Sequence, residues 1–145
     1  MKARISDDCV KYIYGAFNHD HGAWEIGGII LGFRHDNEIT AIKAVLVPST
    51  NDCSYSYSLD GDKATDIVNS SEYDFVGIWH SHINSCDHFS ETDKKINQEF
   101  AEMFGYIISI LIVSDNEDSI RIFAFLVNKD GENMWCLWKP SSIEK

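Results

Sequence analysis

The sequence predicts an α+β domain in which helices flank a mixed β-sheet. Two observations support this class: several β-branched apolar runs are bounded by turn residues, and segments with helical spacing of apolar residues lie between them. Their order is helix, two or three strands, helix, strand, helix and three strands. The chain has 145 residues, 44% of them hydrophobic, so we expect one domain over residues 1–145 with a core that needs no disulfides.

The first helix is predicted to begin at Ser6, an N-cap residue followed by the acidic Asp7 and Asp8. Apolar residues then recur at helical spacing as far as residue 18; they are Cys9, Val10, Ile13, Tyr14 and Phe17. Residues 19–22 are expected to form an exposed loop. The His-x-His of His19 and His21 is therefore not expected to bind a metal.

Three strands are predicted to follow. Residues 26–33 form an apolar run whose glycines indicate the close approach of another backbone. A turn at 34–37 connects this run, as a hairpin, to a second strand that ends at Pro48. Residues 54–59 alternate strictly between polar and apolar side chains, which predicts a half-buried strand.

The second half of the chain alternates between helices and strands. Asp60 and Asp62 precede a helix that is expected to end near residue 71, and a short apolar strand covers 75–80. Ser90 is predicted to open the third helix, whose apolar positions are Ile96, Phe100, Met103 and Phe104. Three strands with turns between them complete the chain, at 106–113, 120–127 and 134–138.

The composition excludes several classes of protein. A net charge of −11, without a long run of like charges, argues against binding to nucleic acid. The apolar runs are too short to span a bilayer, and the first residues do not resemble a signal peptide. We expect a cytoplasmic protein without a nucleic-acid or membrane partner. Its cysteines are then free thiols: Cys9, Cys53, Cys86 and Cys136.

His80, His82 and Asp93 are the candidate metal ligands. In an extended segment alternate side chains point to the same face, so the two imidazoles lie side by side. Together with one carboxylate they provide three ligands, the number that leaves a zinc ion one open position for water. Without a metal, the histidines would be a core and a loop residue, and Ser90 with Asp93 would simply cap a helix.

This spacing resembles the signature of the JAMM (MPN+) zinc metalloproteases. The matching residues are the His-Ser-His of 80–82, Ser90 after seven residues, and Asp93 after two more. The family also has a glutamate ahead of an apolar, glycine-containing strand, and Glu25 occupies that position. The resemblance covers about residues 5–138 and implies the cytidine-deaminase-like MPN fold, in its compact, prokaryotic stand-alone form.

The resemblance also implies a role for each residue. His80, His82 and Asp93 would hold one Zn²⁺ per chain, which lowers the pKa of a water to about 7. Glu25 would act as general base, taking a proton from the attacking water and later passing it to the leaving amine. Ser90 would donate a hydrogen bond to the oxyanion of the tetrahedral intermediate.

The loop between the histidines and the third helix departs from the family pattern. Ile83 and Phe89 stand where members often have proline, which affects the shape of the loop but supplies no catalytic atom. The loop also carries Cys86, Asp87 and His88, each of which can bind a metal; Cys86 in the fourth position would close the site, as in a latent protease. The residues expected to pack around the loop are Trp79 and Phe89.

Members of this family cleave amide or isopeptide bonds after the C-terminal glycine of ubiquitin or a ubiquitin-like protein. The resemblance implies such an isopeptidase, acting on a ubiquitin-like modifier, its conjugate or a sulfur-carrier protein. E1- and E2-like enzymes of the same pathway and antiviral (antiphage) defence are the implied context. The substrate tail is expected to add a strand at an edge near 54–59. The alternative is a catalytically silent MPN-like scaffold that binds proteins, although no motif residue is missing.

Overall fold

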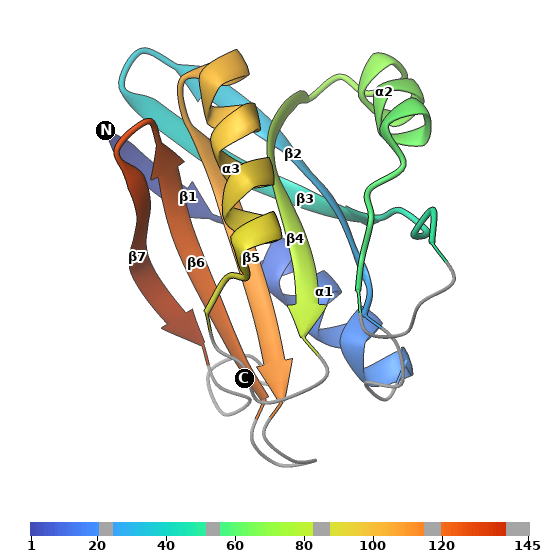
Figure 1. Ribbon diagram of the computed structural model, residues 1–145. Coiled ribbons are helices and arrows are strands. Elements are labelled where there is room, and N and C mark those ends of the chain that lie inside the picture. The colour runs from blue at the N-terminus through green and yellow to red at the C-terminus, as the bar shows by residue number, and fades with distance from the viewer. Residues whose placement is uncertain (21–24, 52–55, 83–87, 115–119, 139–145) are drawn as a thin grey trace.

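The computed structural model describes residues 1–20, 25–51, 56–82, 88–114 and 120–138. In chain order, the elements of these residues are β1 (Lys2–Ile5), α1 (Asp7–Asp20), β2 (Gly27–His35), β3 (Glu38–Leu46), α2 (Gly61–Asn69), β4 (Asp74–His82), α3 (Glu91–Phe104), β5 (Ile107–Ser114), β6 (Ile120–Asn128) and β7 (Gly131–Trp138). They form an α+β fold with a mixed sheet and flanking helices, as the sequence predicts (Figure 1).

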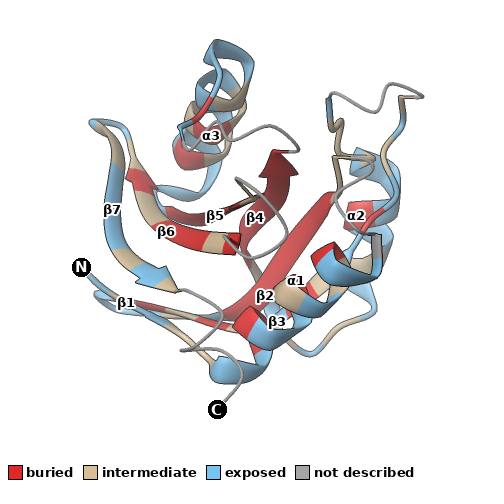
Figure 2. Cartoon of the chain, turned by 90° about the horizontal axis from the view of Figure 1, so that it is seen from below, coloured by how far each residue is buried: buried red, intermediate tan, exposed pale blue. Residues whose placement is uncertain are grey.

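The seven strands of the described chain form one sheet in the order β1-β3-β2-β4-β5-β6-β7. The sheet is mixed because β1 pairs with β3, and β4 with β5, in parallel, whereas the other neighbours are antiparallel. Viewed along the strands, the sheet curls (Figure 2). β4 occupies the middle of the sheet and is hydrogen-bonded on both sides.

Helices α1 and α3 cover opposite faces of this sheet (Figures 1 and 2). The buried face of α1 carries Ile13 and Phe17, which share one apolar cluster with Trp79 of β4. On the other face, Phe100 of α3 packs on Phe75, with 5.2 Å between the ring centroids. Because both faces are covered, β5 is buried along nearly its whole length and is apolar throughout apart from two serines.

Helix α2 packs over the side of the sheet formed by β2 and β3. Ala64 is its buried residue and shares an apolar cluster with Ile29 and Leu31 of β2. The N-cap is Asp60, whose side chain accepts the backbone N–H of Lys63 at 3.1 Å. The cap therefore fixes where the preceding segment, which borders the candidate site, enters the helix.

The predicted helix starts are confirmed, and one helix is longer than expected. Ser6 Oγ accepts the Cys9 N–H at 3.1 Å, and Ser90 caps α3. Helix α1 runs to Asp20, so the prediction of a loop from residue 19 is wrong for its first two residues. His19 lies in the last turn of α1 and is exposed; His21 lies outside the described residues.

The strand predicted at 54–59 is wrong for its described part, residues 56–59, which belong to no strand. Side-chain hydrogen bonds replace a ladder there: Ser58 N–H donates to Ser49 Oγ at 3.0 Å, and Asn51 Nδ2 donates to Ser56 Oγ and Ser58 Oγ. Alternation alone does not distinguish such a segment from a strand. Residues 54 and 55 lie outside the described chain.

Two further differences concern strands. β1 was not predicted, because its four residues show little pattern and gain a partner only from β3, with Ala3 opposite Ile39. β4 extends to His82, two residues beyond its predicted end, so both motif histidines belong to a strand.

The structure describes two of the four cysteines. Cys9 and Cys136 are free thiols, while Cys53 and Cys86 lie outside the described residues. Among the residues described, none of the helices has the length and apolar character needed to cross a bilayer.

Candidate metal centre

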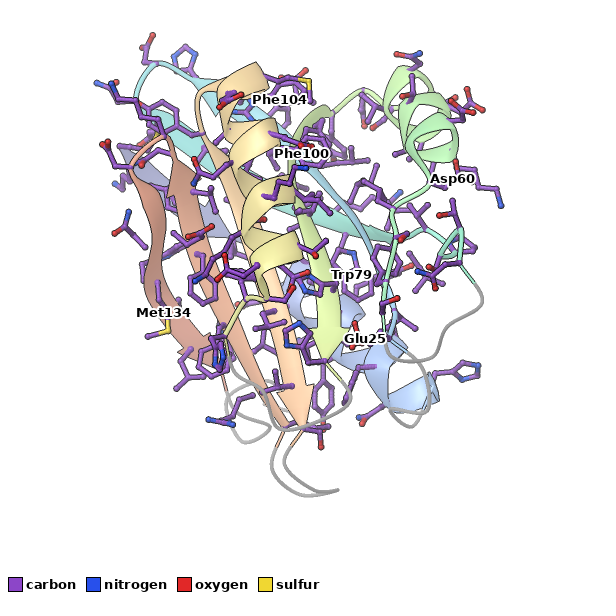
Figure 3. All side chains as sticks on the ribbon, in the orientation of Figure 1. Glu25, Asp60, Trp79, Phe100, Phe104 and Met134 are labelled. Atoms are coloured by element: carbon purple, nitrogen blue, oxygen red, sulfur yellow. The ribbon has the colours of Figure 1, made fainter. Side chains whose placement is uncertain are left out.

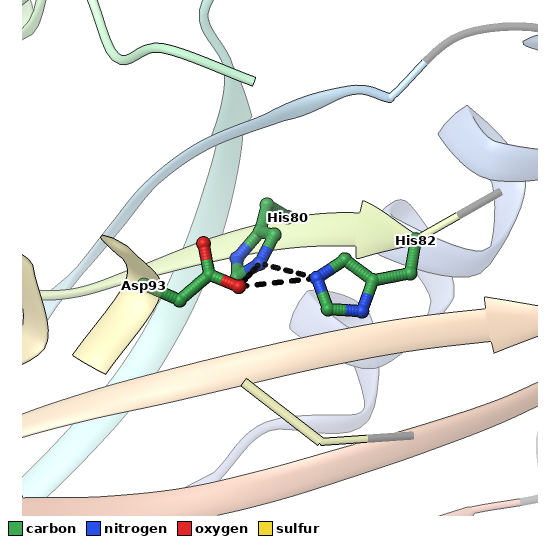
Figure 4. Close-up of side chains that lie close together, drawn as sticks. All are labelled: His80, His82 and Asp93. Carbon is green, nitrogen blue, oxygen red and sulfur yellow. Dashed lines mark hydrogen bonds and ion pairs between the residues drawn. The ribbon is translucent and has the colours of Figure 1, made fainter. Parts of the chain in front are cut away.

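His80, His82 and Asp93 lie together where β4 ends and α3 begins (Figure 4). Strand alternation directs both imidazoles to the face of β4 that α3 covers, and each histidine residue is only 7% exposed. Asp93 is in the first turn of α3 and reaches back toward the strand. The structure therefore brings together the three ligands predicted from the sequence.

Three atoms of these residues form a nearly equilateral triangle. His80 Nε2 lies 3.2 Å from His82 Nε2, and Asp93 Oδ2 lies 3.2 Å from the first and 3.1 Å from the second. Nitrogen and oxygen ligands about 2.0–2.1 Å from a tetrahedral zinc ion are separated by roughly 3.3 Å. The triangle thus matches one face of a zinc coordination tetrahedron, and no described residue supplies a fourth ligand.

Hydrogen bonding alone accounts poorly for this arrangement. Asp93 Oδ2 also accepts the backbone N–H of Ser90 at 3.0 Å. Without a cation, each Nε2 either donates to this oxygen, giving it three donors for two lone pairs, or directs a lone pair toward it. With a cation between the three side chains, one lone pair binds the ion and the other accepts the Ser90 N–H. The residues present therefore fit a metal ion.

The capping box and the metal-facing carboxylate occur together. Ser90 Oγ accepts the Asp93 N–H at 3.1 Å while the Asp93 carboxylate accepts the Ser90 N–H. The helix-capping alternative is thus correct in its geometry, yet it does not remove Asp93 from the cluster. Burial alone raises the pKa of Asp93, but hydrogen bonds with His80 and His82 outweigh it and hold this pKa well below its usual value.

Glu25 lies just ahead of β2 (Figure 3), close enough to His82 and Asp93 for their charges to affect it. Gly27 pairs with His80 in the antiparallel ladder, so Glu25 falls opposite His82. The neighbouring residue, Ile26, is held twice by Ser81: its N–H donates to Ser81 Oγ at 2.9 Å, and its C=O accepts the Ser81 N–H at 2.8 Å. The serine between the two histidines therefore fixes the backbone next to Glu25.

The surroundings of Glu25 suit a base that works near neutral pH. Burial raises the pKa of its carboxyl group from 4.5 to about 7, the nearby His82 lowers it, and the Asp93 carboxylate raises it. A carboxyl group with such a pKa exchanges its proton readily near pH 7. The sequence contained no local signal for this residue; only the resemblance to the metalloprotease family selected it.

Gly27 is required where β2 passes the histidines. A Cβ atom at this position would lie 2.5 Å from the Trp79 carbonyl oxygen and 2.9 Å from Cε2 of Tyr57. The predicted close approach of another backbone is confirmed here. Any side chain at residue 27 would push Tyr57 or β4 away from the cluster.

The loop residues that departed from the family pattern are only partly described. Cys86 and Asp87 lie outside the described residues, and whether they reach a metal stays a prediction. His88 is exposed and does not belong to the three-residue cluster. The two aromatic residues predicted to pack are buried, Trp79 at 1% and Phe89 at 4% exposure.

A cavity of about 40 Å³ adjoins the cluster. His80 and Asp93 form one end of it, and its walls are mainly apolar, with Tyr57 and Leu59 on one side and α3 on the other. Asn97 of α3 also lines it and is 1% exposed. Sequence reasoning missed this residue, although an asparagine four residues after Asp93, on the apolar face of a helix, was a usable signal.

The fold and the cluster define a JAB-type domain with a potential metal site. The sequence matches the family of prokaryotic homologs of the JAB domain over residues 16–126. The chain therefore belongs to this family, as the resemblance predicted. No curated protein is similar enough in sequence to count as a relative.

A solved structure supports the fold independently. The solution structure of protein DSY2949 from Desulfitobacterium hafniense is similar to this one, with a TM-score of 0.68 and 16% sequence identity. The match covers 92% of this chain and 89% of that protein. At this identity the likeness concerns the fold alone.

Proposed function

We propose that this protein is a zinc-dependent isopeptidase or peptidase that cleaves after the C-terminal glycine of a ubiquitin-like modifier or sulfur-carrier protein. The observation that carries the proposal is the triangle of His80 Nε2, His82 Nε2 and Asp93 Oδ2, with sides of 3.1–3.2 Å. The described part of the chain supplies no fourth ligand to this triangle, and Glu25 is close enough for His82 and Asp93 to act on its charge. Zinc at this position would supply a Lewis acid that lowers the pKa of water to about 7.

Glu25 and Ser90 would supply the remaining chemistry. The Glu25 carboxylate would accept the proton of the attacking water and then give it to the leaving amine, which suits a pKa near 7. Ser90 Oγ uses a lone pair to accept the Asp93 N–H. Its O–H proton therefore remains available to donate to a developing oxyanion.

The path of the substrate would run between residues 57–59 and α3. Ser58 uses both its backbone groups within the protein: its N–H donates to Ser49 Oγ and its C=O accepts the Thr50 N–H. A peptide tail adding to this segment would therefore pair with Tyr57 and Leu59, both of which line the cavity beside the cluster. This agrees with an extended tail that ends at the metal.

The test is cleavage of a ubiquitin-like protein fused through its Gly-Gly tail to a reporter. We expect zinc-dependent cleavage that chelator abolishes and that Glu25→Gln lowers by about 10²–10⁴-fold. Glu72→Gln, which removes the same charge at an exposed position, is the matched control and should cleave normally. Cleavage that survives both chelator and Glu25→Gln would refute the mechanism.

A further inference from the structure

Asn97 is a buried amide that is only half satisfied. Its Oδ1 accepts the hydroxyl of Ser109 in β5 at 3.1 Å, and Ser109 is itself fully buried. Its Nδ2 is buried and has no hydrogen-bond partner in the described part of the chain. Leaving a buried donor unpaired costs about 1–3 kcal/mol. A ligand that accepts a hydrogen bond from this N–H group would remove that cost.

The cavity beside the metal cluster is where such a ligand can sit. Asn97 lies one helical turn after Asp93. Both residues line the cavity because residues four apart share a face of α3. Ser109 holds the amide oxygen, so the amide group is oriented before any ligand arrives. The third α3 residue in the lining is Ile96, which has no polar side-chain atom.

A peptide strand in this position has two hydrogen-bonding edges. Residues 57–59 can satisfy one edge with backbone groups, but the other edge faces α3, whose backbone is already bonded within the helix. Carbonyl oxygens on that edge need a side-chain donor. Of the α3 residues that line the cavity, Asp93 can only accept, so Asn97 is the available donor.

We propose that Asn97 is a substrate-binding residue whose Nδ2 donates to one backbone carbonyl oxygen of the substrate tail, just before the scissile bond. The ligand is a neutral carbonyl, because a carboxylate there would face the Asp93 carboxylate. This inference rests on the proposed function and adds a contact on the helix side of the substrate.

The experiment compares Ser109→Ala with the double variant Asn97→Leu/Ser109→Ala. Both lack the bond between residues 97 and 109, and leucine has the branched shape of asparagine without its polar atoms, so the pair differs in the amide group of residue 97. The substrates are fluorogenic tail peptides in which one of the last three carbonyls before the scissile bond is replaced by a thiocarbonyl, a weak acceptor. Circular dichroism and zinc content verify that both variants are folded and loaded.

At one of the three positions, the replacement should lower kcat/KM about 5- to 100-fold in Ser109→Ala and by less than threefold in the double variant. Equal effects in both variants at every position would overturn the inference and leave the proposed function standing. If wild-type protein cleaves none of the peptides, the proposed function fails. In that case, calorimetry measures how tightly the two metal-free variants bind the same peptides. A thiocarbonyl that weakens binding to Ser109→Ala and not to the double variant would support the inference, and equal effects would overturn it.

Discussion

Ser90 and Asp93 hold each other through two hydrogen bonds, and the oxygen that accepts the Ser90 N–H also faces both histidines. One carboxylate oxygen thus starts helix α3 and completes the candidate metal triangle. The cap of the helix and the metal site therefore share these two residues. Substitutions can separate their effect on stability from their effect on catalysis.

Ser90 should contribute to stability and to catalysis by different atoms. Ser90→Ala removes the cap and the hydroxyl, so we expect a loss of about 1 kcal/mol in unfolding free energy and of about 10²–10³-fold in kcat. Ser90→Asn keeps a capping oxygen but no hydroxyl, and should restore stability without restoring kcat. Ser6→Ala, which uncaps α1, is the control that loses stability alone. Full activity in Ser90→Asn would exclude the hydroxyl as an oxyanion donor.

Zinc should stabilise the folded chain through the three ligands. At free zinc about 100 times above Kd, binding adds about 2.7 kcal/mol, which raises Tm by roughly 8 °C for a domain of this size. His82→Gln should abolish this increase, because it removes one corner of the triangle. His35→Gln is the control, since His35 is exposed on the β2–β3 hairpin. A zinc-induced shift of equal size in His82→Gln would show that the ion binds elsewhere.

The buried carboxyl group of Glu25 should make the stability of the metal-free protein depend on pH. The folded pKa is about 7 and the ordinary value is 4.5. Between these values the unfolded chain releases a proton that the folded chain keeps, so wild-type stability falls as pH rises from about 4.5 to 7. Glu25→Gln lacks this group and should gain stability relative to wild type over that window, with no further change above it.

Urea unfolding of both proteins in chelator measures this difference. Asp93 titrates with a lowered pKa, so its stabilising contribution is lost only as pH falls below the usual aspartate range, and it is common to both proteins. A difference between the two proteins that does not vary with pH would show that Glu25 is solvated as an ordinary glutamate.

Ser81 should position Glu25 without touching the metal. Ser81→Ala removes the acceptor of the Ile26 N–H, so we expect faster hydrogen exchange at Ile26 and a lower kcat, with one zinc still bound. Ser81→Thr keeps the hydroxyl and should behave like wild type. Faster exchange with an unchanged kcat would mean that the backbone beside Glu25 tolerates movement.

Local sequence pattern was sufficient for the metal ligands and for most elements. His80 and His82 were predicted from alternation, and Asp93 from its place at a helix start. Glu25 required the family resemblance, because 55 residues separate it from His80 and only the pairing of β2 with β4 joins them. β1 was not predicted for the same reason: Lys2 pairs with Glu38, which is 36 residues away along the chain.

Ser81 and Asn97 were missed for a different reason. Each is a polar residue among apolar neighbours, and its role depends on which atom its hydroxyl or amide meets. Ser81 meets Ile26 across a ladder, and Asn97 meets Ser109 across a helix–sheet contact. Residues 56–59 were predicted as a strand because alternation does not reveal that Ser49 and Asn51 supply the hydrogen bonds.

The position of β4 between β2 and β5 bears on which ion the site accepts. His80 is paired with Gly27 on one side and Leu111 on the other, so the backbone that carries this ligand is held by two ladders. Ca²⁺ takes six to eight oxygen ligands, whereas this triangle offers two imidazole nitrogens and one carboxylate oxygen. The central sheet pairing thus holds in place a ligand set that suits Zn²⁺ and not Ca²⁺.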